Sequence, residues 1–303
     1  MQIGIMSGAT GGPDGTVDGL VKRCQELEER GFHSVWMANI FGLDAIGALG
    51  IVGRETRRIE LGTAVVPSYP RHPMAIAQQA LTTQAASGGR FALGIGLSHQ
   101  IVIESMMGLS YDKPARHMRE YLSVLTPLLR KENVSFQGEQ YRVNGAIDIA
   151  DAAAVPLLVA ALGDHMLKLA GSRTDGTVLW MTGPDTIENH IGPKLRDAAQ
   201  ATGRGEPRIV AGFPILLTDS PDVARERIGQ ALAMYGTLPS YRAMLDKEGA
   251  AGPADISIVG DEKALDASLD RLRDIGVTDF NAAILPLEEG ADKRTLDYLQ
   301  SRL

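Results

Sequence analysis

The sequence places one histidine, His99, where an ionisable side chain could transfer protons. His99 is the middle residue of the tripeptide Ser98-His99-Gln100, and it follows a glycine-containing apolar run, residues 91–98. An imidazole titrates near neutral pH, so His99 could donate or accept a proton as a general acid or base. In the alternative interpretation, His99 only forms hydrogen bonds with neighbouring groups. Three other side chains are weaker candidates for proton transfer: Asp44, Tyr69 and Glu104.

A second candidate site is the tetrapeptide Leu162-Gly163-Asp164-His165, where a predicted strand turns into a predicted helix. Exposed amide groups at the start of a helix bind phosphate without needing a basic side chain. Gly163 has no side chain that would block the approach of such a group. In the alternative interpretation this is an ordinary turn, in which the Asp164 carboxylate caps the helix.

Several well-known catalytic and nucleotide-binding motifs are absent from the sequence. It contains no glycine-rich phosphate loop followed by Lys-Ser/Thr, and no G-x-G-x-x-G opens a helix. Gly94-Ile95-Gly96 lies within a predicted strand, where glycines favour close backbone approach over pyrophosphate binding. The six histidines are scattered, and the single cysteine, Cys24, excludes an intramolecular disulfide and a cysteine-built zinc site. We therefore expect no metal site, and we expect Cys24 to be a buried structural thiol.

Length and composition narrow the class of protein. A chain of 303 residues is ordinary for a single β/α barrel, and 44% hydrophobic residues suffice for a sizeable core. The net charge of -7, with both signs mixed along the chain, gives no electrostatic footprint for nucleic acid. An uncharged apolar stretch at 152–163 is shorter than the roughly 20 residues of a spanning helix, and the N-terminal apolar run is too short for a signal peptide. We expect a cytoplasmic protein that binds neither nucleic acid nor membrane.

Short apolar runs alternate with longer amphipathic ones from end to end, which predicts a parallel sheet covered by helices. Eight runs are predicted strands: 2–6, 33–39, 59–66, 91–98, 156–162, 176–182, 209–218 and 279–285. The predicted helices are 16–30, 43–53, 72–87, 114–130, 164–172, 184–202, 221–235, 261–275 and 293–303. Strand 156–162 is apolar throughout, as expected when both faces of a sheet are covered.

Eight β/α units indicate a closed barrel, because an open doubly wound sheet usually has six strands. We predict a single-domain (β/α)8 TIM barrel over residues 1–303, with insertions after strands four and seven. The first insertion includes a hairpin-like excursion at 133–149, and the second is irregular over 238–259. Active sites of such barrels lie at the carboxyl ends of the strands, directly after which stand residues such as Ser7 and Gly8. Long loops usually carry function, so we expect both insertions to form a lid.

Several segments, in this order, resemble the luciferase-like monooxygenase superfamily. They are Gly-Phe-His-Ser-Val-Trp at 31–36, Ile-Glu-Leu-Gly-Thr-Ala-Val at 59–65, Arg-His-Pro at 71–73, and Gly-Gly-Arg-Phe-Ala-Leu-Gly-Ile-Gly at 88–96. The later segments 160–163 and 174–177 fit the same pattern. The similarity covers essentially the whole chain, and the combination is specific although each piece alone is weak. Within the superfamily, the chain is most similar to the deazaflavin-dependent oxidoreductases of actinobacteria.

The resemblance implies coenzyme F420 as the cofactor, a small organic molecule as the substrate, and a homodimer. In relatives the third strand ends in a bulge whose non-proline cis peptide bond backs the deazaflavin ring, and the matching bond here is Ala64–Val65. Relatives bind the cofactor phosphate at the turn that corresponds to Leu162–His165. The implied cofactor-binding residues are Asn39, Thr63, Ala64, Val65, Ser98, Ala161, Leu162, Gly163, Asp164, His165 and Trp180.

The chain departs from the family where several relatives carry a proton donor. Relatives place an acidic residue or histidine at the end of strand two, and a glutamate just after strand four. Here these positions are Asn39, Ile40 and Leu97, none of which is a general acid. This departure argues against sugar-phosphate and alcohol substrates and leaves His99 as the catalytic hypothesis. It favours hydride transfer that reduces an imine or an activated alkene.

Two alternatives remain open at this point. An FMN-dependent monooxygenase of the same superfamily would bind FMN and consume oxygen. A non-catalytic cofactor-binding barrel would explain the substituted acid positions. For the remaining side chains we expect local roles: Trp36 in the core, Arg71 and His72 at a helix start, Trp180 in the pocket or the core, and Arg116, His117, Arg119 and Glu120 on a solvated helix face.

Overall fold

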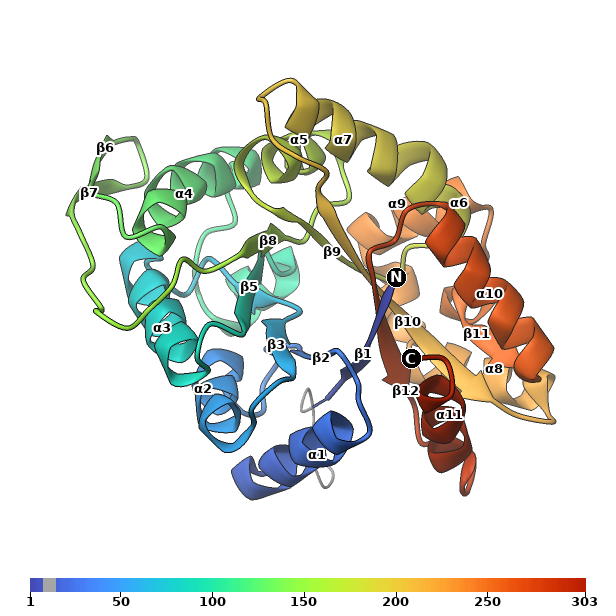
Figure 1. Ribbon diagram of the computed structural model, residues 1–303. Coiled ribbons are helices and arrows are strands. Elements are labelled where there is room, and N and C mark those ends of the chain that lie inside the picture. Colours follow the sequence, from blue (N-terminus) through green and yellow to red (C-terminus); the bar gives the residue numbers. More distant parts are fainter. Residues whose placement is uncertain (8–14) are drawn as a thin grey trace.

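Eight parallel strands close into a barrel in the computed structural model, which describes residues 1–7 and 15–303 (Figure 1). The barrel order is β1 (Gln2–Met6), β2 (Ser34–Met37), β3 (Glu60–Thr63), β5 (Phe91–Gly96), β8 (Leu157–Val159), β9 (Gly176–Trp180), β10 (Arg208–Leu217) and β12 (Asp279–Ile284). The ring closes because β12 pairs with both β1 and β10. The TIM barrel and all eight predicted strands are confirmed.

Helices surround the barrel as an outer layer (Figure 1). They are α1 (Val17–Glu29), α2 (Ala45–Glu55), α3 (Pro73–Ala86), α4 (Pro114–Leu129), α5 (Asp164–Arg173), α6 (Pro184–Thr186) with η3 (Ile187–Ile191) and α7 (Gly192–Gln200), α8 (Pro221–Ala231), α10 (Glu262–Asp274) and α11 (Ala291–Gln300). Side chains of Thr16, Asp44 and Asp261 cap the first turns of α1, α2 and α10. Within the described residues, no helix is long and apolar enough to cross a membrane.

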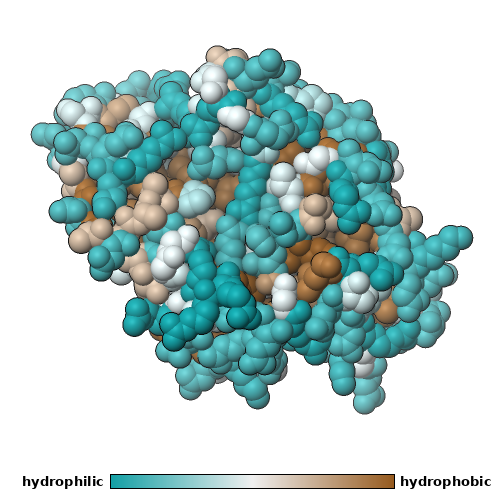
Figure 2. Space-filling view, in the orientation of Figure 1, coloured by the Kyte–Doolittle hydropathy of each residue, from teal (hydrophilic) through white to brown (hydrophobic). Residues whose placement is uncertain are grey.

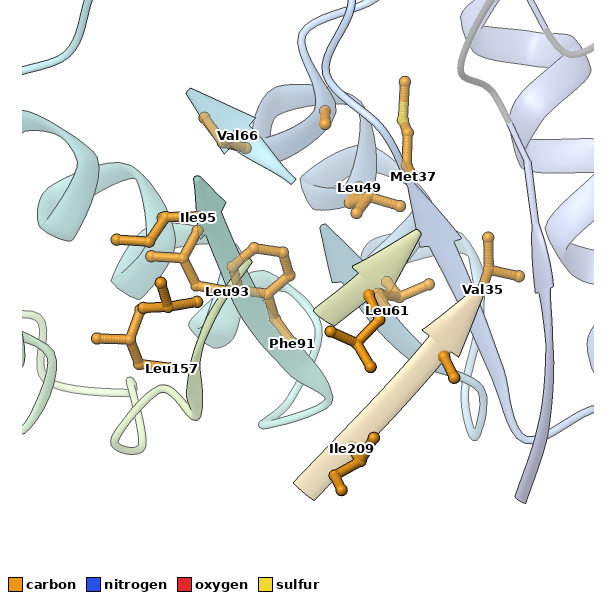
Figure 3. Packing of buried hydrophobic residues seen from close by; sticks show 14 of the residues in the cluster. Val35, Met37, Leu49, Leu61, Val66, Phe91, Leu93, Ile95, Leu157 and Ile209 are labelled. Carbon is orange, nitrogen blue, oxygen red and sulfur yellow. The ribbon is translucent and has the colours of Figure 1, made fainter. Parts of the chain in front are cut away.

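The main core lies between the sheet and the helices. Figure 3 shows strand residues of this core, among them Val35, Leu61 and Leu93, together with Leu49 of α2. Cys24 is buried in the same core, as predicted. The outer helix faces carry hydrophilic side chains over much of the surface seen in Figure 2. This two-sided burial explains why the strands are apolar without alternation.

A smaller core fills the interior of the barrel. It consists of Trp36, Ala92, Leu158, Val178 and Val210, with Ala64 and Val65 packed against it. The Trp36 side chain is inaccessible to solvent, and its indole nitrogen donates a hydrogen bond to Ser34 Oγ at 2.9 Å. The core position expected for Trp36 is therefore confirmed.

The first insertion follows β5. It contains a π-helical turn, η2 (Val102–Met106), then α4, then an antiparallel hairpin of β6 (Val134–Gln137) and β7 (Arg142–Gly145). The hairpin predicted at 133–149 is confirmed. In Figure 1 it lies beside α4 at the outside of the helical layer.

The second insertion follows β10, and its prediction was wrong in part. Residues 238–259 are not irregular: they contain α9 (Pro239–Glu248), a short helix η5 (Pro253–Ile256) and most of β11 (Ile258–Gly260). Pro239 stands in the first turn of α9, and Gly249 ends the helix with φ 74, a left-handed conformation that glycine tolerates. β11 pairs with the end of β10, as an extra strand beside the barrel.

The amino-terminal ends of three strands are joined by one guanidinium group. Arg208 on β10 donates to Glu60 on β3 (Nη1 to Oε1, 2.8 Å) and to Asp279 on β12 (Nε to Oδ2, 2.8 Å). The guanidinium also lies 5.2 Å from the centre of the Trp36 ring on β2. His33 brings a third ligand atom near the two carboxylates, but Arg208 already binds both carboxylates. The cluster is therefore a salt-bridge clamp, and we assign no metal to it.

Replacing Arg208 by methionine should lower the free energy of unfolding by about 3 kcal/mol. The reason is that Asp279, which is almost inaccessible, would keep its charge without a counter-ion. Urea unfolding followed by circular dichroism measures the change. Arg273→Met is the matched control, because its partner Asp270 is exposed and its loss should change stability little. Equal urea midpoints for the two variants would contradict the clamp.

Candidate functional site

A cavity of about 330 Å³ opens at the carboxyl ends of the barrel strands. Its inner wall comes from strand residues that include Met6, Ala64, Ala160, Trp180 and Ala283. Its outer wall comes from both insertions, through His99, Val102 and Met107 on one side and Tyr235, Leu238 and Tyr241 on the other. Both insertions thus stand at the cavity, where a lid was predicted. The volume of the cavity suits part of a small organic ligand.

Charged side chains are absent from the described residues that line this cavity. Its polar side chains are all neutral amides, hydroxyls, an indole and an imidazole: Asn39, Ser98, His99, Trp180, Tyr235, Tyr241 and Asn281. Burying an isolated charge is costly unless a partner of opposite charge is supplied. The cavity therefore suits the uncharged part of a ligand.

Exposed apolar side chains gather at the loops around the cavity. The described chain has ten exposed large hydrophobic residues. Seven of them stand in the segments that follow β2, β5 and β10: Ile40, Phe41, Ile101, Met106, Met107, Leu109 and Met234. Four of the seven, Ile40, Phe41, Met107 and Met234, also line the cavity. Such a concentration is typical of a binding surface, because isolated exposed residues scatter more evenly.

The peptide bond between Ala64 and Val65 is cis, as the resemblance predicts. Both residues line the cavity, directly after β3. Thr63, by contrast, points away from the cavity into the sheet, where its hydroxyl donates to Gly94 O and accepts from Gly94 N, both at 2.8 Å. A side chain at Gly94 would place its Cβ 2.0 Å from Thr63 O, so the glycine permits the close approach predicted for it. Thr63 thus holds β3 to β5 beneath the cavity.

The turn after β8 is only partly in the cavity. Leu162 lines it, whereas Ala161 is buried on the other side, in the main core. Gly163, Asp164 and His165 are exposed at the start of α5, beside the cavity. A Cβ built at Gly163 would meet no atom within 4 Å, so the space in front of this helix start is open.

The capping role expected for Asp164 is wrong. Gly163 is the capping residue, and Asp164 is the first residue of α5. The Asp164 carboxylate instead forms an ion pair with Lys194 of α7 at 2.5 Å, which lowers its pKa. This leaves the first amide groups of α5 without a side-chain cap.

His99 and its neighbours stand at the cavity as predicted. Asn39, Ser98, His99 and Trp180 all line it. The His99 ring lies 5.6 Å from the Tyr241 ring, and desolvation by burial lowers the pKa of the imidazole below its ordinary value. The side-chain oxygen of Asn39, Oδ1, accepts a hydrogen bond from Ala45 N at 3.0 Å. The side-chain nitrogen, Nδ2, is therefore the group left to donate into the cavity.

The other proton-transfer candidates lie outside the set of lining residues. Asp44 caps α2 and pairs with Arg71, Glu104 binds Gln100 and the Tyr111 amide, and Tyr69 stacks on His117. His72 accepts a hydrogen bond from Met74 N at 3.2 Å, which confirms the helix-start role. Ser7 and Gly8 were expected at the active-site end of the first strand, and Gly8 lies outside the described residues.

Tyr235, Tyr241 and Asn281 were missed by sequence reasoning. Trp180, Tyr235 and Tyr241 form a chain of edge-to-face contacts, with ring centres 6.1 Å and 5.3 Å apart. The tyrosines come from an insertion whose path cannot be read from the chain. Asn281 had a detectable signal, a polar residue within the apolar strand Asp279–Ile284.

The solvated face expected on α4 is wrong for two of its four residues. His117 and Glu120 are buried because the β6–β7 hairpin covers them. Glu120 accepts hydrogen bonds from the backbone amides of Glu139, Gln140 and Tyr141 in the hairpin turn. His117 shares a hydrogen bond with Ser68 Oγ at 2.9 Å and stacks on Tyr69, and burial lowers its pKa to about 4.

Comparisons with known proteins agree with this architecture. A family model described as luciferase-like monooxygenase matches residues 1–280. The 5,10-methylenetetrahydromethanopterin reductase of Methanolobus tindarius is 27% identical over 297 residues, covering 88% of this chain and 90% of that protein. The F420-dependent glucose-6-phosphate dehydrogenase of Kineococcus radiotolerans is 30% identical over 215 residues, covering 66% and 64%. The structure of the coenzyme F420-dependent tetrahydromethanopterin reductase from Methanopyrus kandleri superposes with a TM-score of 0.81 at 21% identity, covering 100% and 98%.

His117 should make the folded state acid-sensitive. Its pKa falls from 6.5 to about 4 on folding, so the unfolded chain takes up the proton first as pH drops. The stabilisation is complete above pH 6.5 and should decline by about 3 kcal/mol between pH 6.5 and 4, at roughly 1.4 kcal/mol per pKa unit. Urea unfolding at a series of pH values measures this decline. His117→Gln should remove that part of the slope, and parallel curves for the two proteins would show that His117 is not its source.

Proposed function

The chain belongs to the luciferase-like monooxygenase family, and from this premise we propose that it is a cytoplasmic, coenzyme F420-dependent oxidoreductase. The reaction transfers a hydride between the deazaflavin and a small organic substrate. The observation that carries the proposal is the uncharged cavity beside the Ala64–Val65 bond, next to an open helix start at Gly163. The relative from Kineococcus radiotolerans is named as an F420-dependent dehydrogenase, which supports the cofactor. The relative from Methanolobus tindarius is named as a reductase, which supports the reaction type.

The chain offers two kinds of surface to such a cofactor. The neutral wall formed by Ala64, Val65 and Ser98 suits a planar ring, and the Asn39 amide can donate a hydrogen bond to it. The uncapped amides that follow Gly163 suit the anionic tail, because a helix start stabilises negative charge. Asp164 and His165 flank this start, and Leu162 joins it to the cavity. When bound, a deazaflavin supplies or accepts the hydride at C5.

We assign the proton that accompanies the hydride to His99. The imidazole lines the cavity, and its lowered pKa keeps it neutral at neutral pH. A neutral imidazole accepts a proton when the substrate is oxidised, and it becomes a strong donor only below its pKa. The cavity offers no described cation to hold a sugar phosphate. An imine or an activated alkene fits this neutral pocket and is the substrate class of the proposal.

The FMN-dependent alternative follows from the family description itself, since luciferase-like enzymes include monooxygenases. FMN would use the same wall and the same helix start. A non-catalytic barrel is disfavoured by the position of His99, a titratable group inside an otherwise neutral cavity. Association into a homodimer rests on the resemblance alone, and sedimentation velocity decides it.

Purified protein should bind coenzyme F420 more tightly than FMN, as measured side by side by fluorescence quenching. Gly163→Val should weaken F420 binding at least tenfold, since a branched side chain would occupy the open space before α5. Gly205→Val is the matched control, because Gly205 also has no atom near its Cβ position but lies away from the cavity. A preference for FMN would transfer the proposal to oxygen-dependent chemistry. Equal F420 affinity of both variants would remove Gly163 from the site.

The pH dependence of turnover should report His99. For substrate reduction, kcat/KM should rise as pH falls through the lowered pKa, below 6.5, because only the imidazolium donates readily. For substrate oxidation, the same group should lower kcat/KM below that pH and leave a plateau above it. His99→Gln should flatten this limb and lower kcat by about 100-fold, with unchanged F420 affinity. A variant that keeps both the limb and full turnover would exclude His99.

A further inference from the structure

Asn281 is a buried polar side chain that the described protein leaves without hydrogen bonds. It stands in the middle of β12 and exposes no surface to bulk solvent. Among residues 1–7 and 15–303, neither its amide nitrogen nor its amide oxygen has a hydrogen-bond partner. Burying an amide group without a partner is costly, so native structures rarely keep one without a reason. Asn281 borders the cavity, which supplies such a reason.

The direction of the Asn281 side chain follows from the alternation along the strand. Its neighbours Phe280 and Ala282 belong to the core between sheet and helices, so Asn281 points into the barrel. Ala283, two residues further on, lines the cavity as well. The carboxamide therefore stands at the floor of the cavity.

The residues in register with Asn281 on both neighbouring strands are glycines. In the parallel register, Asn281 is opposite Gly4 on β1 and Gly212 on β10, neither of which carries a side chain. Where a Cβ of Gly212 would stand, the nearest atoms are Trp180 Cε3 at 2.9 Å, Leu179 O at 3.1 Å and Met6 Cε at 3.5 Å, and all three residues line the cavity. A methionine side chain rearranges easily, so Met6 in the cavity wall can adjust to a ligand that enters.

We infer that Asn281 is the polar anchor of the cavity for a lactam or imide edge of the ligand. A carboxamide offers a donor and an acceptor side by side, and a ring N–H beside a ring C=O is its complement. The neutral lining around it excludes a charged partner for this end of the ligand. The inference deepens the proposed function, and it rests on that function only for the identity of the cofactor. The pyrimidine edge of a deazaflavin and an amide-containing substrate share this chemistry.

The test compares two neutral probes that differ at one atom. Lumiflavin carries the imide edge, and 3-methyllumiflavin carries a methyl group in place of the N3 hydrogen. Wild-type protein should bind lumiflavin about tenfold more tightly, the value of one hydrogen bond to a buried group. Asn281→Leu should bind both probes equally. Fluorescence quenching gives all four affinities.

Thermal unfolding of the ligand-free protein keeps the test independent of catalysis. Because Asn281→Leu removes an unpartnered buried amide, it should raise the melting temperature by about 2 °C. Asn144→Leu, at an exposed position of the β6–β7 hairpin, is the control and should not raise it. A lower melting temperature of Asn281→Leu would show that the amide is structural, and would overturn the inference. Equal affinity of wild type for the two probes, or no binding of lumiflavin, would overturn it as well.

The affinity of the Asn281→Leu variant for coenzyme F420 shows whether the lactam or imide edge belongs to the cofactor or to the substrate. A tenfold loss of F420 affinity in Asn281→Leu assigns the anchor to the cofactor. Unchanged F420 affinity, together with lost discrimination between the probes, assigns it to the substrate. If wild type discriminates between the probes but does not bind F420, the proposed cofactor is wrong and the anchor stands.

Discussion

A charge clamp reinforces the closed barrel at the amino-terminal ends of its strands. Arg208 begins β10, Glu60 begins β3 and Asp279 begins β12, so one guanidinium joins strands that are far apart in the sequence. The two carboxylates raise the pKa of Arg208 above its ordinary value, and the group stays charged at any pH at which the protein is folded. A charge this confined is tolerable because each of the three guanidinium nitrogens donates to a carboxylate oxygen. The clamp therefore fixes the relative positions of three strands at one end of the barrel.

The opposite end of the barrel is built by the reverse principle. Above the clamp, Trp36 and its neighbours fill the interior, and above them the strands carry glycine, alanine and single amides. Gly94 lets Thr63 tie β3 to β5, and Gly212, in register with Asn281, allows the Trp180 ring to approach closely. Within the eight barrel strands, the charged side chains Glu60, Arg208 and Asp279 stand at the amino-terminal end, whereas the cavity at the carboxyl-terminal end is lined by neutral described residues. This polarity explains why stability and ligand recognition occupy separate layers of the same strands.

Sequence patterns were sufficient for the barrel because each strand is buried on both faces and each helix has one apolar face. The carboxyl ends of the strands directed attention to Asn39, Ser98 and Trp180, and these three residues line the cavity. The periodicity of α4 failed, since His117 and Glu120 lie on a face that the β6–β7 hairpin and the residues Ser68 and Tyr69 cover. Thr63 and Ala161 are not among the lining residues, because each points away from the cavity while its neighbour in sequence lines it. Hydrophobic periodicity predicts helices and strands but not which distant insertion reaches the cavity, so the position of Tyr241 could not be predicted.

The division of the cavity wall has a consequence for specificity under the proposed function. The inner wall, from Ala64 to Asn281, belongs to the rigid strands, whereas Met107, Tyr235 and Tyr241 belong to the two insertions. Changes in the insertions can therefore alter the substrate pocket without disturbing the strands that hold the cofactor. His99 stands at the junction, since it directly follows β5 and contacts Tyr241. A side chain at this junction touches the space of both ligands, which is the place where a proton must be exchanged if a hydride crosses between them.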